Sequence, residues 1–222
     1  GKVLSTIADG PFKVNRTEQY AVDYPVAVVD HTPGVRDWVW QVATDKQGHP
    51  VIAMVKISGD KKKHDYYYTY WDGQAWKEIF LAHGGGHFHQ TPDIERCYSG
   101  GMAIDPAHPE VVYCSVPVSG AFGCVYEIVK YTVDGRSGDV KAEPVTRHSR
   151  KNNVRPYILP DSESSPLRLA WMHGDYFDWI VSSARPGYPT SVYGDFRWEE
   201  EPVKLEERLL SRGERLTFES SA

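Results

Sequence analysis

The segment "YSGGMAIDPAHPEVVYCSVPVSG" (98–120), followed by "CVYEIVKYTVDG" (124–135) and "VKAEPVTRH" (140–148), decides the fold expected for this chain. Runs of β-branched and aromatic residues alternate there with Gly, Pro and Asp turns, which is typical of antiparallel strands joined by short loops. The same order of strands and turns is found earlier, in the runs 37–45, 50–58, 65–73 and 75–82. The two copies align at an offset of 60, which pairs Ala43 with Ala103, Asp45 with Asp105 and Val51 with Val111.

A third, less complete copy comprises the stretches 153–166, 167–178 and 179–187. Repeats of four short strands at this period predict the blades of a β-propeller. The expected fold is therefore all-β, a propeller with four-stranded antiparallel blades. About three blades and the end of an earlier one are expected within residues 1–198. A propeller needs at least four blades, and an open arc leaves strand edges unpaired, so a missing segment or a second chain is expected to complete the ring.

The remaining residues, 199–222, form a charged tail that fits either a short helix stopped at Gly213 or the start of a second β domain. The net charge of -5 argues against nucleic-acid binding, which requires a basic surface. No stretch is apolar for long enough to span a membrane, and no signal peptide is visible. The basic run Lys61–His64 is expected to be a solvated loop tip. The three cysteines leave room for one disulfide.

The stretch "HGGGHFHQTPDIERCYSGG" (83–101) carries the densest chemistry. His87 and His89 alternate around Phe88, so on a strand they would share a face and could bind zinc or calcium. The alternative is a glycine-rich loop between blades with surface histidines. The glycines at its end allow a sharp turn or a close backbone approach just after Tyr98.

Residues at the entry to each blade's first strand should converge on one face near the propeller axis. This prediction makes Trp38, Tyr98 and Arg155 neighbours. Tyr98 could transfer protons with help from the charges of Arg96 and Arg155, or it could be a packing tyrosine. Arg155 suits bidentate capture of a carboxylate or sulfate, or it could form an ion pair between blades.

His173 lies among Trp171, Tyr176 and Trp179, a setting that suits a sugar site. The alternative is a buried histidine that hydrogen-bonds to the backbone. Aromatic residues make up 13% of the chain, which fits sugar stacking and equally fits the preference of aromatic residues for strands.

Four stretches resemble the BNR-type seven-bladed propellers of polysaccharide lyases, which include ulvan lyases and lyases of rhamnose–glucuronate linkages. They are "WDGQAW" (71–76), "CYSGGMAIDPAHPEVVYCS" (97–115), "NNVRPYILP" (152–160) and "LAWMHGDY" (169–176). The resemblance covers roughly residues 37–180. One departure is Cys114–Val116, which stands where family members commonly carry an arginine.

The resemblance implies a lyase that cleaves a 4-linked uronic acid by β-elimination, with Tyr98 as the acid or base and Arg155 as the carboxylate clamp. It implies an acidic polysaccharide as partner and a secreted or periplasmic location. Trp38, Arg96, Trp171 and Tyr176 are then the candidate substrate-binding residues. His87, His89 and His173 are the candidate ligands of a structural zinc or calcium ion.

Two other functions fit the same residues. A propeller glycoside hydrolase needs two carboxylates, for which Asp93, Glu95 and Asp175 are available. A non-catalytic carbohydrate-binding propeller module needs no acid–base pair.

Overall fold

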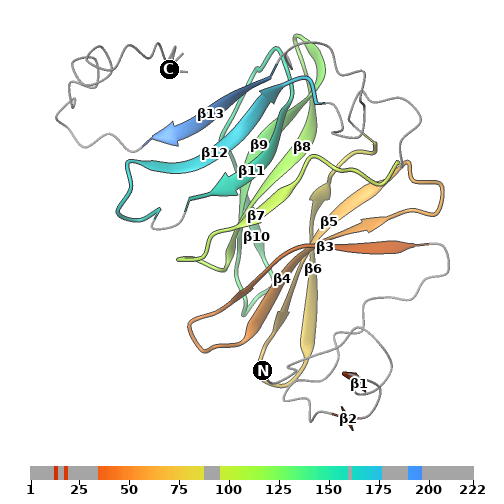
Figure 1. Ribbon diagram of the computed structural model, residues 1–222, viewed down its shortest axis with the longest axis vertical. Helices are drawn as coiled ribbons and strands as arrows, with labels where there is room; N and C mark the ends of the chain where they lie inside the picture. The colour runs from red at the N-terminus through yellow and green to blue at the C-terminus, as the bar shows by residue number, and fades with distance from the viewer. Residues whose placement is uncertain are drawn as a thin grey trace.

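The computed structural model describes residues 13–14, 18–19, 35–87, 96–159, 162–176 and 190–196. All regular elements in these ranges are β-strands (Figure 1). The first sheet has the order β3-β4-β5-β6 and is an antiparallel meander. Its strands are β3 (Arg36–Thr44), β4 (Pro50–Ile57), β5 (His64–Trp71) and β6 (Trp76–His83). A short pair, β1 (Lys13–Val14) and β2 (Glu18–Gln19), precedes it.

Two further sheets follow in chain order. The second is again a four-stranded antiparallel meander, β7-β8-β9-β10, and the third has the order β11-β12-β13. The strands of the second sheet are β7 (Met102–Ile104), β8 (Val111–Gly120), β9 (Gly123–Val133) and β10 (Val140–Pro144). Those of the third are β11 (Asn153–Ile158), β12 (Leu167–Gly174) and β13 (Thr190–Phe196).

The alternation of side chains along the strands packs the sheets face to face. In β8, Val112 and Cys114 belong to a core shared with the first sheet, while Val111 and Tyr113 belong to a core shared with the third. Successive residues of a strand point to opposite faces, so one strand supplies both cores. The second sheet is therefore buried on both faces, as a blade between two neighbouring blades must be.

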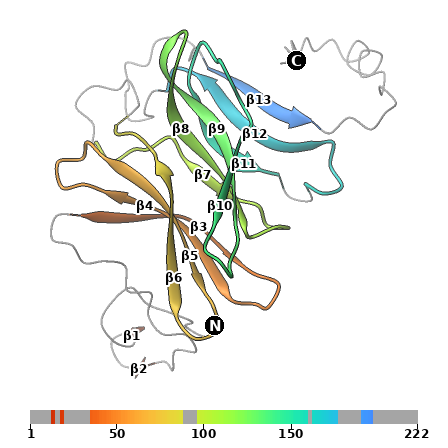
Figure 2. The ribbon, with the colours of Figure 1, turned by 180° about the vertical axis from the view of Figure 1, so that it is seen from behind.

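The first strands of the three sheets lie next to one another. β7 contacts β3 on one side and β11 on the other, and in both views it runs between these two strands (Figures 1 and 2). The Gln41 side chain links the first two blades, because it accepts a hydrogen bond from the Ile104 backbone N–H at 2.8 Å. This arrangement is that of consecutive propeller blades, and the prediction of an all-β partial propeller is confirmed.

Aspartates close the turns that the repeat had marked. Oδ1 of Asp45 accepts hydrogen bonds from two backbone N–H groups, and Oδ1 of Asp105 accepts one from the Ala107 N–H in the equivalent turn. The second of these loops is the longer one. The Asp45 N–H donates to the carbonyl of His49, whereas the Asp105 N–H donates to that of the more distant Val111. The partner of Ala43 is Val51, whereas that of Ala103 is Tyr113, so the predicted match of Val51 with Val111 is wrong by two residues.

Other expectations are corrected or fall outside the described residues. His64 is not part of a solvated loop tip, because it begins β5 and its side chain is buried. The three cysteines are free thiols, so the one disulfide that the sequence allowed is not formed. The sequence did not identify Thr190–Phe196 as the third strand of the last blade, and the stretch 179–187 and the tail 199–222 lie outside the described residues. No helix among the described residues has the length and apolar character needed to cross a membrane.

Candidate functional site

Glycines allow the segments on both sides of Tyr98 to press against buried side chains. A Cβ on Gly84 would lie 2.5 Å from the ring of Tyr66, and one on Gly100 would collide with the side chain of Ser115. The Tyr66 hydroxyl accepts a hydrogen bond from the Gly101 N–H at 3.2 Å. Burial raises the pKa of Tyr66 far above its ordinary value, so this hydroxyl stays protonated and acts as an anchor for the loop.

Tyr98 emerges from this anchored segment and meets the first blade. Its ring lies 5.7 Å from that of Trp38, at an interplanar angle of 59°. Trp38 is 42% exposed, and Tyr98 is partly buried. The pair therefore presents aromatic surface and a phenol hydroxyl at the boundary between the first two blades.

Arg155 has the most unusual backbone among the candidate residues. Its φ is +57°, a left-handed conformation that is rare for residues other than Gly, Asn and Asp. It lies at an irregularity in the pairing of β11 with β12, between Val154 and Tyr157. The Arg155 N–H donates to the carbonyl of Gly100 at 2.7 Å, and a Cβ on Gly101 would lie 3.3 Å from the Cα of Arg155. The loop that carries Tyr98 thus holds Arg155 in a conformation that costs about 1–2 kcal/mol.

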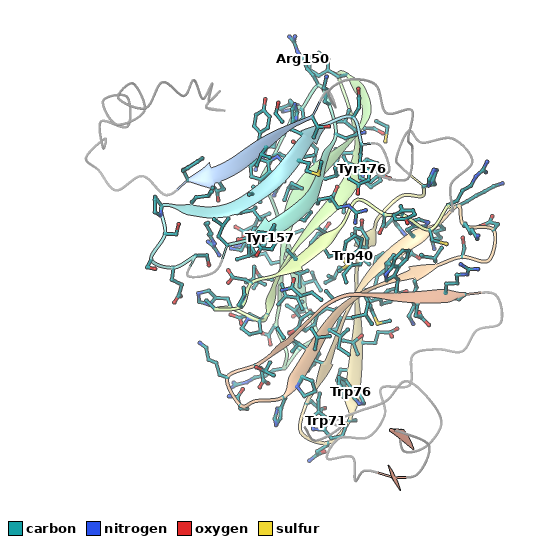
Figure 3. The ribbon with its side chains drawn as sticks, viewed as in Figure 1. Trp40, Trp71, Trp76, Arg150, Tyr157 and Tyr176 are labelled. Atoms are coloured by element: carbon teal, nitrogen blue, oxygen red, sulfur yellow. The ribbon has the colours of Figure 1, made fainter. Side chains whose placement is uncertain are left out.

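The bulge directs the guanidinium of Arg155 toward two aromatic rings. Its carbon lies 4.8 Å from the ring centre of Trp40 on β3 and 5.0 Å from that of Tyr176, which follows β12. Nη2 also donates a hydrogen bond of 3.3 Å to the Tyr176 hydroxyl. Figure 3 shows Trp40 and Tyr176 on the inner side of the sheets, while Trp71 and Trp76 lie at the far end of the first sheet. Arg155 therefore joins the first and third blades across the second.

His173 is tied to the interface between the second and third blades. Its Nδ1 lies 2.8 Å from Oδ1 of Asn153, and Nε1 of Trp171 donates to the same oxygen at 2.9 Å. Nδ2 of Asn153 donates to Oε2 of Glu127 at 3.0 Å. Glu127 is 3% exposed, and its carboxyl also accepts hydrogen bonds from Thr146 and Ser149. We call the group of Glu127, Asn153, Trp171 and His173 the Asn153 network.

The buried histidine of β5 and His87 of the glycine-rich stretch (83–101) have different surroundings from those of His173. Nε2 of the buried His64 is 3.2 Å from the carbonyl of Arg96, which fixes the end of the loop to the first blade. Burial lowers the pKa of His64, and burial together with the charge of Arg96 lowers that of His87.

The Arg155 side chain contacts Trp40 and Tyr176, and the Tyr98 ring contacts Trp38. The backbone bond from Arg155 to Gly100 joins the two sets of contacts, and we call these five residues the Arg155 cluster. Trp171 is not part of it, because its ring is packed in the core of the second and third sheets with 8% of its surface exposed. Sequence reasoning missed Trp40 and Asn153. Trp40 stands two residues after Trp38 on the same strand, which was a usable signal.

The candidate metal ligands are only partly described. His87 and His173 belong to different surroundings, and His89 lies outside the described residues. Among the described residues, no group of three or more His, Cys, Asp or Glu side chains is arranged to hold a metal ion.

The chemistry available to the Arg155 cluster is anion and ring binding. A guanidinium presents several N–H donors in one plane, which matches the two oxygens of a carboxylate. Exposed aromatic faces such as that of Trp38 offer apolar surface with a defined orientation. The combination fits a ligand that carries both a carboxylate and flat, weakly polar ring faces.

Comparison with known proteins agrees with this architecture. The family model described as "BNR repeat-containing family member" matches residues 1–83, a range that includes the whole first sheet. No curated protein and no solved structure matches the chain. The match supports a BNR-type β-rich protein and suggests a carbohydrate-related propeller-type domain.

Proposed function

We propose that this BNR-type propeller chain binds a uronic-acid-containing polysaccharide at Arg155 and cleaves it by β-elimination. The observation that carries the proposal is the placement of Arg155, whose guanidinium lies between Trp40 and Tyr176 on a left-handed backbone. Strained backbone of this kind is concentrated at functional sites, because selection for stability alone would remove it.

Arg155 would bind the carboxylate of the uronate. Neutralising that carboxylate makes the proton on the adjacent C5 more acidic, which is the first requirement of β-elimination. Donors aimed at developing charge in a site shielded from water contribute strongly to catalysis. Here the guanidinium of Arg155 is such a donor, and the flanking rings of Trp40 and Tyr176 shield it from water.

Tyr98 would carry the proton transfers. As the base, its phenolate takes the C5 proton, the C5–H electron pair forms the C4–C5 double bond, and the oxygen at C4 leaves. The same hydroxyl, now protonated, returns a proton to the leaving oxygen, so no redox partner is consumed. Trp38, 5.7 Å from the Tyr98 ring, would orient that ring and stack on the sugar.

The proposal extends to the surroundings of the protein. An acidic polysaccharide substrate is found outside cells, so we propose a secreted or periplasmic location. A further segment or a second chain would supply the remaining blades. Such blades would also complete the ligand-binding face around the Arg155 cluster.

The test is incubation of the whole chain with ulvan, following the ultraviolet absorbance of an unsaturated uronate. We expect the band to appear with the wild type and to be reduced about 100–1,000-fold in Arg155→Lys, which keeps the charge but loses the planar fork. Tyr98→Phe should lose about 100–10,000-fold, the usual range for a general acid or base. Thr132→Ser, on the outer part of the second blade, serves as the matched control.

Two outcomes would contradict the proposal as a whole, and a third would contradict the role of Tyr98. New reducing ends without the ultraviolet band would indicate a glycoside hydrolase. Ulvan binding with neither product would indicate a non-catalytic module. Full activity of Tyr98→Phe would remove Tyr98 from the mechanism while leaving the Arg155 clamp in place.

A further inference from the structure

The turn between β8 and β9 projects from the second blade and exposes an aromatic ring. Gly120 pairs with Gly123, so the two-residue turn between them holds Phe122. Phe122 is 51% exposed, and a Cβ on either glycine would meet no heavy atom within 4 Å. Val118 is also exposed, at 41%. We call residues 118–124 the hairpin tip, and it presents apolar surface to solvent.

A second exposed segment, rich in basic residues, lies against this tip. Residues 147–151, which we call the basic segment, connect β10 to β11 and include Arg147, Arg150 and Lys151, all of them exposed. The guanidinium carbon of Arg150 lies 5.2 Å from the centre of the Phe122 ring. Neither the hairpin tip nor the basic segment contains an acidic residue, although the net charge of the chain is -5. Positive charge and aromatic surface are therefore concentrated at this end of the second blade.

Hydrogen bonds to the Asn153 network hold the basic segment beside the hairpin. Ser149, in the middle of the segment, donates through its N–H and its hydroxyl to the carboxyl of Glu127 on β9, at 2.8 Å each. Just after the segment, Oδ1 of Asn152 accepts a hydrogen bond from the Tyr126 N–H at 3.0 Å. The buried carboxylate of Glu127 offsets one of the three exposed cations, so this group of residues keeps a positive charge.

The hairpin tip lies on the side of the blades that carries the Arg155 cluster. A Cβ on Gly100, whose carbonyl accepts from the Arg155 N–H, would lie 3.0 Å from Cδ1 of Tyr126. Phe122 stands four residues before Tyr126, so the tip extends about 13 Å beyond this point at the usual rise of a strand. Arg150 precedes Arg155 by five residues, a span of at most about 18 Å. In the view of Figure 3, Arg150 lies at the outer end of the molecule, beyond Tyr176.

We propose that the hairpin tip and the basic segment form a second subsite, which binds anionic groups of the same polysaccharide outside the Arg155 cluster. This proposal rests on the proposed function for its ligand. Arg150 and Lys151 would pair with carboxylate or sulfate groups, and the ring of Phe122 would pack on a sugar face. The stacking of Arg150 on Phe122 repeats that of Arg155 on Trp40, at 5.2 and 4.8 Å. The short span to the Arg155 cluster favours a polysaccharide over an anionic lipid surface.

The test uses the exposed Cys124 of the hairpin tip, which accepts an environment-sensitive fluorophore because Cys97 and Cys114 are buried. The labelled whole chain is titrated at low salt with ulvan, and separately with dextran sulfate, which carries sulfate groups but no uronate. We expect both polymers to change the fluorescence. Arg150→Ala with Lys151→Ala should weaken the binding of both about 2–30-fold, the value of two exposed ion pairs. Added salt should reduce this difference, because exposed charges are screened.

Two single variants separate the ring from the charges and the subsite from the rest of the surface. Phe122→Ala should weaken ulvan binding about 2–10-fold, because it removes the aromatic face. Arg136→Ala is the matched control, since Arg136 is an exposed cation in the turn that follows the other end of β9. It should leave binding of both polymers unchanged. The midpoints of urea unfolding should be the same for all these variants, whose side chains are exposed.

The outcomes distinguish the second subsite from the proposed function. If Arg155→Lys weakens ulvan binding and the double variant behaves like Arg136→Ala, the second subsite is wrong and the proposed function stands. If dextran sulfate binds through Arg150 and Lys151 but ulvan does not bind, the anion-binding surface is supported and the proposed function is wrong. If neither polymer binds, both are wrong. Binding to phosphatidylserine vesicles alone would also overturn the proposal and assign the surface to anionic lipid.

Discussion

Removal of Arg168 should weaken the packing of the third blade on the second. Nη2 of Arg168, on β12, lies 2.9 Å from Oδ2 of Asp105, whose side chain is 1% exposed. The other oxygen of Asp105 accepts the Ala107 N–H at 3.0 Å. In Arg168→Met the carboxylate would remain buried without this cation, a change that costs about 3–5 kcal/mol. The side chain of Arg168 is 19% exposed, so water can partly replace it, and we expect a loss of about 3 kcal/mol.

The assay is urea unfolding of the whole chain, monitored by tryptophan fluorescence. With a slope of about 1–3 kcal/mol per molar urea, the midpoint should fall by about 1–3 M. The double variant Asp105→Asn with Arg168→Met should be more stable than Arg168→Met alone, because it no longer buries an uncompensated charge. A loss below about 1 kcal/mol in Arg168→Met would refute the reasoning, since it would mean that water already solvates Asp105.

Three further predictions concern the glycine-rich loop and Arg155. Gly84→Ala should cost about 1–3 kcal/mol, because its Cβ would lie 2.5 Å from the Tyr66 ring, while Gly120→Ala, which meets nothing within 4 Å, should change the midpoint of urea unfolding negligibly. Burial lowers the pKa of His64 from its ordinary value of 6.5, so below that pH the unfolded chain binds more protons than the folded chain. The free energy of unfolding should therefore fall as the pH drops through and below about 6.5. His64→Gln should flatten this pH dependence when urea midpoints are measured on both sides of about pH 6.5. Arg155→Gly should be more stable than Arg155→Ala by about 1–2 kcal/mol in the same assay, because glycine adopts a φ of +57° without strain, although both variants should lose ulvan binding.

The blades could be predicted from the sequence because their chemistry is local. Alternating burial along strands such as β5 (His64–Trp71), and aspartates such as Asp45 and Asp105 at the turns, are direct consequences of residue type. The register beyond the Asp105 turn could not be predicted, because two extra residues in that loop change the strand partners without changing the hydrophobic pattern. Burial of His64 was missed for a related reason, since its partner, the carbonyl of Arg96, is distant in sequence.

For the candidate site, the sequence predicted that certain residues lie near one another but not which side chains contact each other. Blade entries converge on one face, so the proximity of Trp38 and Tyr98 followed from the repeat. The contact between Arg155 and Trp40 did not follow, because it depends on a bulge and a left-handed φ that no pattern of residue types specifies. The resemblance implies substrate binding by Trp171, but alternation along β12 directs its ring into the core.

The conformation of Arg155 connects the fold to the proposed chemistry. Its backbone N–H is held by the Gly100 carbonyl, and the side chain of Asn153, two residues earlier on β11, is held by the buried Glu127 and by Trp171. Gly100 and Glu127 belong to the second blade and Arg155 to the third, so the strain at Arg155 persists only while these two blades are packed together. A guanidinium fixed in this way loses little conformational entropy when it binds a carboxylate, which favours binding over a flexible surface arginine. Packing between blades is therefore expected to set the affinity of the site as well as the stability of the fold.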